Sequence, residues 1–158
     1  MNVLKPQVSI IITNYNYADY LKESIESALS QTYSNIDITL IDDASTDGSH
    51  EIYETYKDKI KIIEHKKNQG IIFSRNEALE SAKGEFIIFL DADDYFDNDY
   101  VEKMIHVAEK YDADVVYPNW GLFGDSNSIM EFSEFHNEKL IRQEMHCTSE
   151  SLIRRSAV

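Results

Sequence analysis

Short apolar runs alternate along this chain with longer stretches in which apolar residues recur every three or four positions. The short runs are continuous and rich in Ile, Val and Phe, which is typical of strands buried on both faces of a parallel sheet. The longer stretches carry a single apolar stripe, which predicts helices that lie against such a sheet. The predicted strands are 8–13, 36–41, 60–64, 86–90 and 115–117, and the predicted helices are 19–31, 50–56, 72–82 and 99–111.

This alternation predicts one α/β domain over residues 1–158, a three-layer sandwich with helices on both faces of a mostly parallel central sheet. The pattern weakens towards the C-terminus. Segment 128–132 is a candidate short strand, 138–145 fits neither helix nor strand, and 152–153 is a short apolar pair. No repeat, linker or low-complexity stretch interrupts the chain, so a single core is expected.

Polar residues mark the expected ends of several helices. Asp19 is the expected N-terminal cap of the first helix, and Asn98 with Asp99 is the expected cap of the last one. Gly84 is the expected C-terminal stop of the third helix, because glycine accepts the backbone angles that end a helix.

Three of the predicted strands run directly into polar residues, at 13–14, 42–43 and 91–94. In a parallel sheet these ends share one edge, and open α/β folds bind their ligands at that edge. The sequence therefore predicts a binding crevice built from three separate strand ends.

The third of these strand ends predicts a metal site. In an extended segment Asp91 and Asp93 point to the same side, and Ala92 points away. Mg²⁺ is usually held by one or two carboxylates together with the phosphates of a substrate. An acidic turn that caps the next helix is the alternative interpretation of this motif.

A nucleoside diphosphate would use the crevice in a consistent way. Tyr15 can stack on the base, and Asp43 can accept an N–H from a pyrimidine ring. Arg75 can approach the diphosphate or the base. Asp91 can bind a ribose hydroxyl, and Asp93 can bind the metal. Helix capping by the acidic pair at 42–43 and a surface position for Arg75 are the alternatives.

The composition excludes several classes of protein. Lys and Arg total 15 against 29 Asp and Glu, a net charge of −14, which argues against binding to nucleic acid. The single cysteine, Cys147, allows no internal disulfide and indicates a reducing compartment. Gly-x-Gly-x-x-Gly, Gly-Lys-Ser/Thr and Gly-x-Ser-x-Gly motifs are absent, which excludes a dinucleotide dehydrogenase, a P-loop NTPase and an α/β-hydrolase.

Five segments, in this order along the chain, resemble the inverting family 2 glycosyltransferases of GT-A fold: 8–16, 27–33, 41–48, 68–76 and 91–94. The resemblance implies transfer of a sugar from a nucleotide sugar, a UDP-sugar above all, to an acceptor hydroxyl with inversion at the anomeric carbon. The acceptor would be a glycan or a lipid-linked sugar, as in polysaccharide biosynthesis. The same resemblance implies that the uridine part of the donor is contacted by Thr13, Tyr15, Asp43 and Arg75. It also implies that the Asp-x-Asp pair is Asp91 and Asp93, with Asp93 the direct ligand of Mn²⁺ or Mg²⁺.

The general base of the reaction is the part of the family pattern that the sequence does not supply. In the family, a segment like 148–156 is followed by a Gly-Gly-Phe stretch and then by an acidic pair that provides the base. The chain stops at Val158, so the expectation is a donor-binding portion with weak or absent transfer. Asp125, Glu131 and Glu134 are acidic candidates, and the sequence does not choose among them.

Two other functions stay open. One is a non-catalytic module that binds a nucleotide sugar or another protein. The other is a sugar-phosphate nucleotidyltransferase, which is disfavoured because no glycine follows the first strand. The N-terminal residues lack a signal-peptide pattern and no apolar run is long enough to cross a membrane, so the expected location is cytoplasmic. Peripheral contact with the inner face of the membrane is compatible with this expectation.

Overall fold

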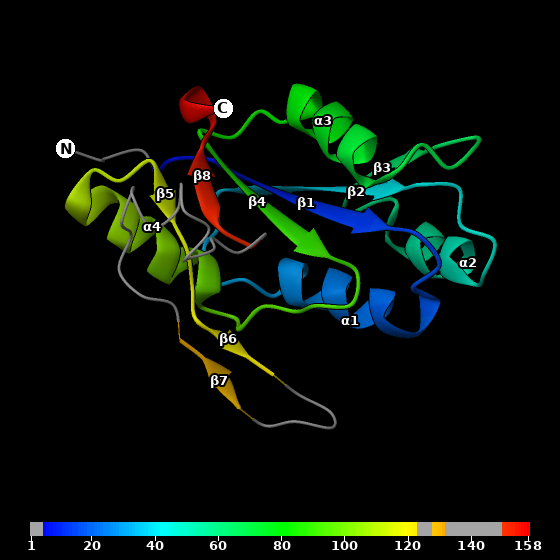
Figure 1. Ribbon diagram of the computed structural model, residues 1–158, viewed down its shortest axis with the longest axis horizontal. Helices are drawn as coiled ribbons and strands as arrows, with labels where there is room; N and C mark the ends of the chain where they lie inside the picture. The colour runs from blue at the N-terminus through cyan, green and yellow to red at the C-terminus, as the bar shows by residue number, and fades with distance from the viewer. Residues whose placement is uncertain (1–4, 123–127, 132–149) are drawn as a thin grey trace, which may run out of the picture.

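The computed structural model describes residues 5–122, 128–131 and 150–158. Figure 1 shows a central sheet covered by α3 on one face and by α1, α2 and α4 on the other. This is the predicted three-layer α/β sandwich. The strands of the main sheet are β1 (Val8–Asn14), β2 (Ile36–Asp42), β3 (Lys61–Glu64), β4 (Phe86–Asp91), β5 (Val115–Val116) and β8 (Leu152–Arg154). The helices are α1 (Ala18–Leu29), α2 (Ser49–Tyr53), α3 (Ile71–Ser81) and α4 (Tyr100–Tyr111), with 3₁₀ turns at Glu54–Tyr56 and Arg155–Ala157.

The strand order is β3-β2-β1-β4-β8-β5, and β3, β2, β1 and β4 pair in parallel. The alternation of β1 divides the core between the two faces. Ile10 and Ile12 pack with α1, α2 and α4, whereas Ile11 packs with Ala78 and Ala82 from the α3 side. All three isoleucines are at most 1 % exposed. Such double burial explains why these strands are continuous apolar runs in the sequence.

The register of the parallel strands brings their polar ends together, as predicted. Thr13 of β1 lies opposite Asp91 of β4, and Asn14 lies opposite Asp42 of β2. The crevice at this edge is therefore fixed by backbone hydrogen bonds on both sides of β1.

The sheet contains one antiparallel strand whose pairing the sequence did not reveal. β8 pairs antiparallel with both β4 and β5, so residues from the end of the described chain lie inside the sheet. Arg154 secures it: its guanidinium bonds to Asp114 at 2.8 Å and Glu85 at 3.0 Å, and stacks 4.7 Å from the ring centre of Phe86. Only the apolar pair 152–153 had signalled this strand.

The described part of the chain also contains a small separate hairpin, β6 (Trp120–Gly121) with β7 (Ile129–Met130). β7 falls within the predicted strand 128–132, while 138–145 lies outside the described residues. None of the described helices combines the length and the apolarity that crossing a membrane requires.

The cap expected for the first helix was wrong, and the one expected for the last helix was right in position but makes no side-chain bond. Asp19 lies inside α1, and the first amide of that helix, at Ala18, instead donates to the Asp47 carboxylate at 2.9 Å from another loop. α4 begins after Asp99, but neither Asn98 nor Asp99 makes a side-chain cap bond. Because Asp47 lies far from α1 in the sequence, the residues near the start of the helix do not indicate this cap.

The role predicted for Gly84, to end the third helix, was also wrong. α3 ends at Ser81 with an extended residue after it, and Gly84 has no left-handed backbone. A Cβ at Gly84 would lie 2.6 Å from both the Phe86 carbonyl oxygen and the Ser9 amide nitrogen. Glycine is required there because two backbone segments approach each other closely.

We expect Gly84→Ala to lower the free energy of unfolding by about 1–3 kcal/mol, because the added methyl group meets backbone atoms that cannot move aside. Urea unfolding followed by circular dichroism measures the change. Gly121→Ala is the matched control, since a Cβ there meets no heavy atom within 4 Å. Equal stability of the two variants would contradict this explanation of Gly84.

Candidate functional site

A cavity of about 420 Å³ lies at the carboxyl ends of β1, β2 and β4. Its volume falls in the range of small-molecule sites. We call it the strand-end cavity. Its walls include Thr13, Tyr15, Asp43, Asp91 and Asp93, which are five of the six site residues predicted from the sequence. The structure thus brings these five residues together, while the roles assigned to them stay predictions.

Arg75, the sixth predicted residue, lies behind the cavity wall rather than in it. Its Nη2 donates to Asp91 Oδ1 at 2.6 Å, and its guanidinium lies 5.3 Å from the ring centre of Phe89. The Thr13 hydroxyl donates to the same Asp91 oxygen at 3.0 Å. Thr13 and Arg75 therefore hold the Asp91 carboxylate in one orientation at the end of β4.

Asp43 is held even more tightly. Its Oδ1 accepts the Gln69 amide at 2.8 Å and contacts His65 Nδ1 at 2.7 Å, while its Oδ2 accepts the Gly70 amide at 2.7 Å. Burial alone would raise the pKa of Asp43, but these hydrogen bonds outweigh it and hold the pKa below its ordinary value. The carboxylate at the cavity wall is therefore an ionised acceptor.

Asp42, the neighbour of Asp43, forms hydrogen bonds with Asn14 and with the loop residue Ser45 instead. Its Oδ1 accepts the Asn14 amide at 2.7 Å and the Ser45 hydroxyl at 2.6 Å, and its Oδ2 accepts the Ser45 backbone amide at 2.9 Å. Helix capping, the alternative interpretation of the acidic pair, does not describe Asp42, because its partners Asn14 and Ser45 lie outside any helix. Asp43 is the residue of the pair that reaches the cavity.

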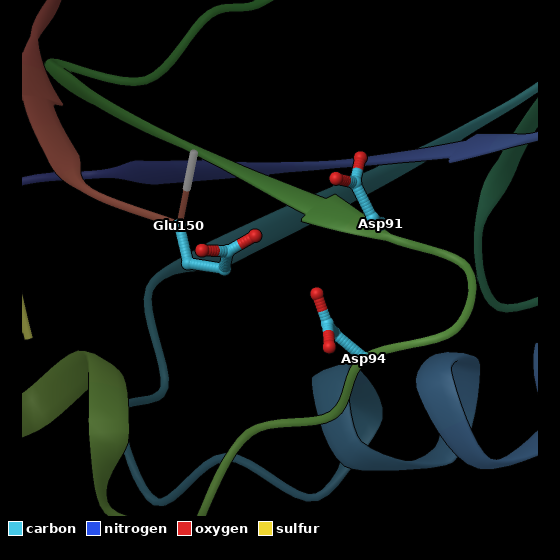
Figure 2. Close-up of side chains that lie close together, drawn as sticks. All are labelled: Asp91, Asp94 and Glu150. Carbon is cyan, nitrogen blue, oxygen red and sulfur yellow. The ribbon is translucent and has the colours of Figure 1, made fainter. Parts of the chain in front are cut away.

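An acidic cluster lies beside the strand-end cavity. Asp91, Asp94 and Glu150 each offer a carboxylate oxygen, and these oxygens lie within 4.8 Å of one another (Figure 2). Oxygen-only donors of this kind suit Mg²⁺ or Mn²⁺. Partial burial, with Glu150, Asp93 and Asp91 nearby, raises the pKa of Asp94 to about 6. Asp93, the predicted metal ligand, is an exposed neighbour of this cluster and is not one of its three members.

A second cavity, of about 380 Å³, lies on the other side of the acidic cluster, and we call it the aromatic cavity. Asp94 and Glu150 form part of its wall, and so do Tyr95 and Trp120. The rings of Phe96 and Tyr100 stack there with centres 4.3 Å apart, and the Tyr100 hydroxyl donates to the Glu150 carbonyl. The acidic cluster thus borders both the strand-end cavity, through Asp91, and the aromatic cavity, through Asp94 and Glu150.

The sequence missed several residues of this site. Glu150 reaches it only through the antiparallel course of β8, and Trp120 comes from the hairpin after the last regular helix. Position 150 does fall in the segment 148–156 that the family resemblance had singled out. Of the three acidic candidates for a base, Glu131 is exposed just after β7, and Asp125 and Glu134 lie outside the described residues.

Comparison with known proteins identifies the family. The model for glycosyl transferase family 2 matches residues 9–155, so the chain belongs to this family. It is 38 % identical over 130 residues to the putative glycosyltransferase EpsH of Bacillus subtilis, covering 80 % of this chain and 37 % of that protein. It is 43 % identical over 114 residues to the Escherichia coli UDP-Glc:alpha-D-GlcNAc-diphosphoundecaprenol beta-1,3-glucosyltransferase WfaP, covering 72 % of this chain and 45 % of WfaP.

Solved structures confirm the GT-A fold. S. aureus TarS in complex with UDP superposes with a TM-score of 0.79 at 26 % identity, covering 95 % of this chain and 47 % of the TarS chain. The mannosyltransferase PcManGT of Pyrobaculum calidifontis, in complex with GDP-Man and Mn²⁺, shares the fold with a TM-score of 0.67 at 23 % identity, over 73 % of this chain and 36 % of its own. The chain thus spans less than half the length of each of these four proteins.

The crowding of carboxylates predicts that Asp94 costs stability at neutral pH. The folded pKa of about 6 exceeds the ordinary 3.8, so the native state binds more protons than the unfolded state between these values. Stability is lost as pH rises through that window and stays low above it. We expect Asp94→Asn to be more stable than wild type by about 1 kcal/mol at pH 7.5, allowing for screening by solvent, and equal to it near pH 3.5.

Urea unfolding across this pH range tests the prediction. Asp58→Asn, an exposed site away from the cluster, is the control for the general loss of one negative charge. A stability gain for Asp94→Asn that is the same at all pH values would show that Asp94 is not crowded by its acidic neighbours.

Proposed function

We propose that this chain binds a nucleotide sugar, a UDP-sugar in particular, and takes part in transferring its sugar to an acceptor hydroxyl with inversion. The observation that carries the proposal is the meeting of Tyr15, Asp43 and Asp91 at one cavity at the ends of three strands. Family membership supports sugar transfer, and the fold shared with the UDP complex of TarS supports the choice of UDP.

The strand-end cavity has a suitable group for each part of the nucleotide. Tyr15, 44 % exposed, offers a ring face to the base, and the ionised Asp43 accepts a base N–H. Thr13 and Arg75 hold Asp91, and we expect Asp91 to accept a ribose hydroxyl. This arrangement leaves Arg75 as a support for Asp91 rather than a direct partner of the diphosphate.

The diphosphate is expected beside the acidic residues that follow β4. A divalent cation, Mn²⁺ or Mg²⁺, would be held there by Asp93, with the acidic cluster next to it, and would neutralise charge on the departing diphosphate. The net charge of −14 favours such a cation, because an anionic ligand would otherwise meet repulsion from the surrounding carboxylates.

The aromatic cavity is the place we propose for the sugar ring of the donor. Aromatic rings pack against the C–H face of a pyranose, and carboxylates accept hydrogen bonds from its hydroxyl groups. The cavity offers both, with Trp120 and Tyr95 beside Asp94. The acceptor we propose is a glycan or a lipid-linked sugar, and the WfaP enzyme of Escherichia coli is named for an acceptor of this class.

Calorimetric titration of the chain with UDP tests nucleotide binding and its metal requirement. We expect binding with Mn²⁺ that weakens at least tenfold when the metal is chelated, and Asp93→Asn to lose this metal dependence. Asp94→Asn is the parallel variant from the acidic cluster, and Asp58→Asn is the remote control. If Asp94→Asn loses the metal dependence of UDP binding and Asp93→Asn keeps it, the metal ligand belongs to the acidic cluster and is not Asp93. Absence of UDP binding by the wild-type chain would contradict the proposed function.

Trp120→Ala tests the aromatic cavity. We expect it to weaken binding of a UDP-sugar about tenfold while the affinity for UDP itself changes less than twofold, because only the sugar would reach Trp120. Comparing the two ligands in the same variant removes any general effect on folding. An equal loss for both ligands would show that the cavity does not hold the donor sugar.

Mass spectrometry of UDP-sugar hydrolysis separates an active transferase from a binding module.

A further inference from the structure

His65 lies between two carboxylates behind the wall of the strand-end cavity. Its Nδ1 is 2.7 Å from Asp43 Oδ1 and its Nε2 is 2.8 Å from Glu77 Oε2. The imidazole side chain is 4 % exposed and the Asp43 side chain 6 %, whereas Glu77, on α3, is 40 % exposed. The ring of Phe73 packs edge-on against the imidazole, with centres 5.7 Å apart.

This geometry determines the charge of the histidine. Ionised carboxylates only accept hydrogen bonds, so both ring nitrogens must donate, and only the imidazolium carries two N–H groups. Burial opposes the charged form, but the hydrogen bonds to Asp43 and Glu77 outweigh it and raise the pKa of His65. In the described structure Asp43 and Glu77 are the titratable groups that face His65, and the Phe73 ring packs edge-on against it.

The imidazolium in turn determines how Asp43 can be used. A carboxylate has about four acceptor positions. Three of those on Asp43 are taken, by His65, by the Gln69 amide and by the Gly70 amide. The position that remains is on Oδ2, and Asp43 is part of the cavity wall. The carboxylate is therefore fixed, ionised and able to accept one more hydrogen bond from a ligand.

We propose that His65 and Glu77 are positioning residues that make Asp43 a selective reader of the nucleobase. An acceptor-only carboxylate favours a base whose ring nitrogen carries a hydrogen, as in uracil, and disfavours one whose ring nitrogen is a bare acceptor, as in cytosine. This inference rests on the proposed function, because it assumes that the strand-end cavity holds the nucleotide. It assigns base selection in part to His65 and Glu77, which act through Asp43 and do not themselves contact the base.

The network predicts a pH dependence with a definite sign. As pH rises through the elevated pKa of His65, the imidazolium loses one N–H, and one of the two carboxylates loses its donor. Asp43 is then less firmly held, so affinity for UDP falls on the alkaline side. Glu77→Gln removes one of the charges that stabilise the imidazolium, so the fall should begin at lower pH.

The experiment measures dissociation constants for UDP and CDP with Mn²⁺ by calorimetry, from about pH 6 to about pH 8.5. Three proteins are compared: wild type, Glu77→Gln and Glu80→Gln. Glu80 is an exposed residue on the same helix, so its variant controls for loss of one negative charge. Titration of the ligand itself is common to all three proteins and cancels in the ratio of their constants.

We expect Glu77→Gln to move the midpoint of the UDP profile down by about one pH unit and to reduce the preference for UDP over CDP about tenfold at pH 8. Glu80→Gln should match wild type. His65→Gln, which offers Asp43 a neutral donor, should bind UDP with no midpoint in this range. The His65 ring signals in NMR give its pKa directly in wild type and in Glu77→Gln.

Two failures can be told apart. If wild type binds UDP but Glu77→Gln and His65→Gln keep its pH profile and its preference over CDP, the positioning role is overturned and the proposed function stands. If wild type binds no UDP at any pH, the proposed function fails and the inference fails with it.

Discussion

The parallel pairing of β1 with β2 on one side and β4 on the other is the constraint on which the rest of this structure depends. Because Asn14 lies opposite Asp42 and Thr13 opposite Asp91, every side chain beyond these pairs emerges at one edge of the sheet. A shift of one residue in either pairing would turn the apolar residues of the strand to the wrong face. The buried isoleucines of β1 therefore protect the geometry of the cavity as well as the stability of the core.

At this edge the carboxylates fall into two groups with different electrostatics. Asp42 and Asp43 have most of their acceptor positions filled by hydrogen bonds from neighbouring loops. Asp94 approaches Asp91 and Glu150, and partial burial together with the neighbouring carboxylates raises the pKa of Asp94. The first group is organised without any ligand. A positive charge would relieve the second group, which is the electrostatic basis of the proposed cation site.

The sequence predicted the parts of this architecture that local pattern determines. The strands 8–13, 36–41 and 86–90 and the shared edge at their ends follow from apolar runs and from the geometry of parallel sheets. It could not predict features that depend on distant partners. β8 is too short to show a pattern, Glu150 reaches the site only through that strand, and His65 is defined by partners 22 and 12 residues away. The same reason explains the missed cap from Asp47 and the steric requirement at Gly84.

The position of β8 has a consequence for how the protein matures in the cell. This strand fills the gap between β4 and β5, so the main sheet is discontinuous until residues 152–154 have been synthesised and have left the ribosome. Until then the exposed side of β4 offers unpaired backbone groups to any neighbouring chain. The acidic cluster acquires Glu150 in the same late event. The candidate cation site of a nascent chain is thus incomplete until β8 has docked.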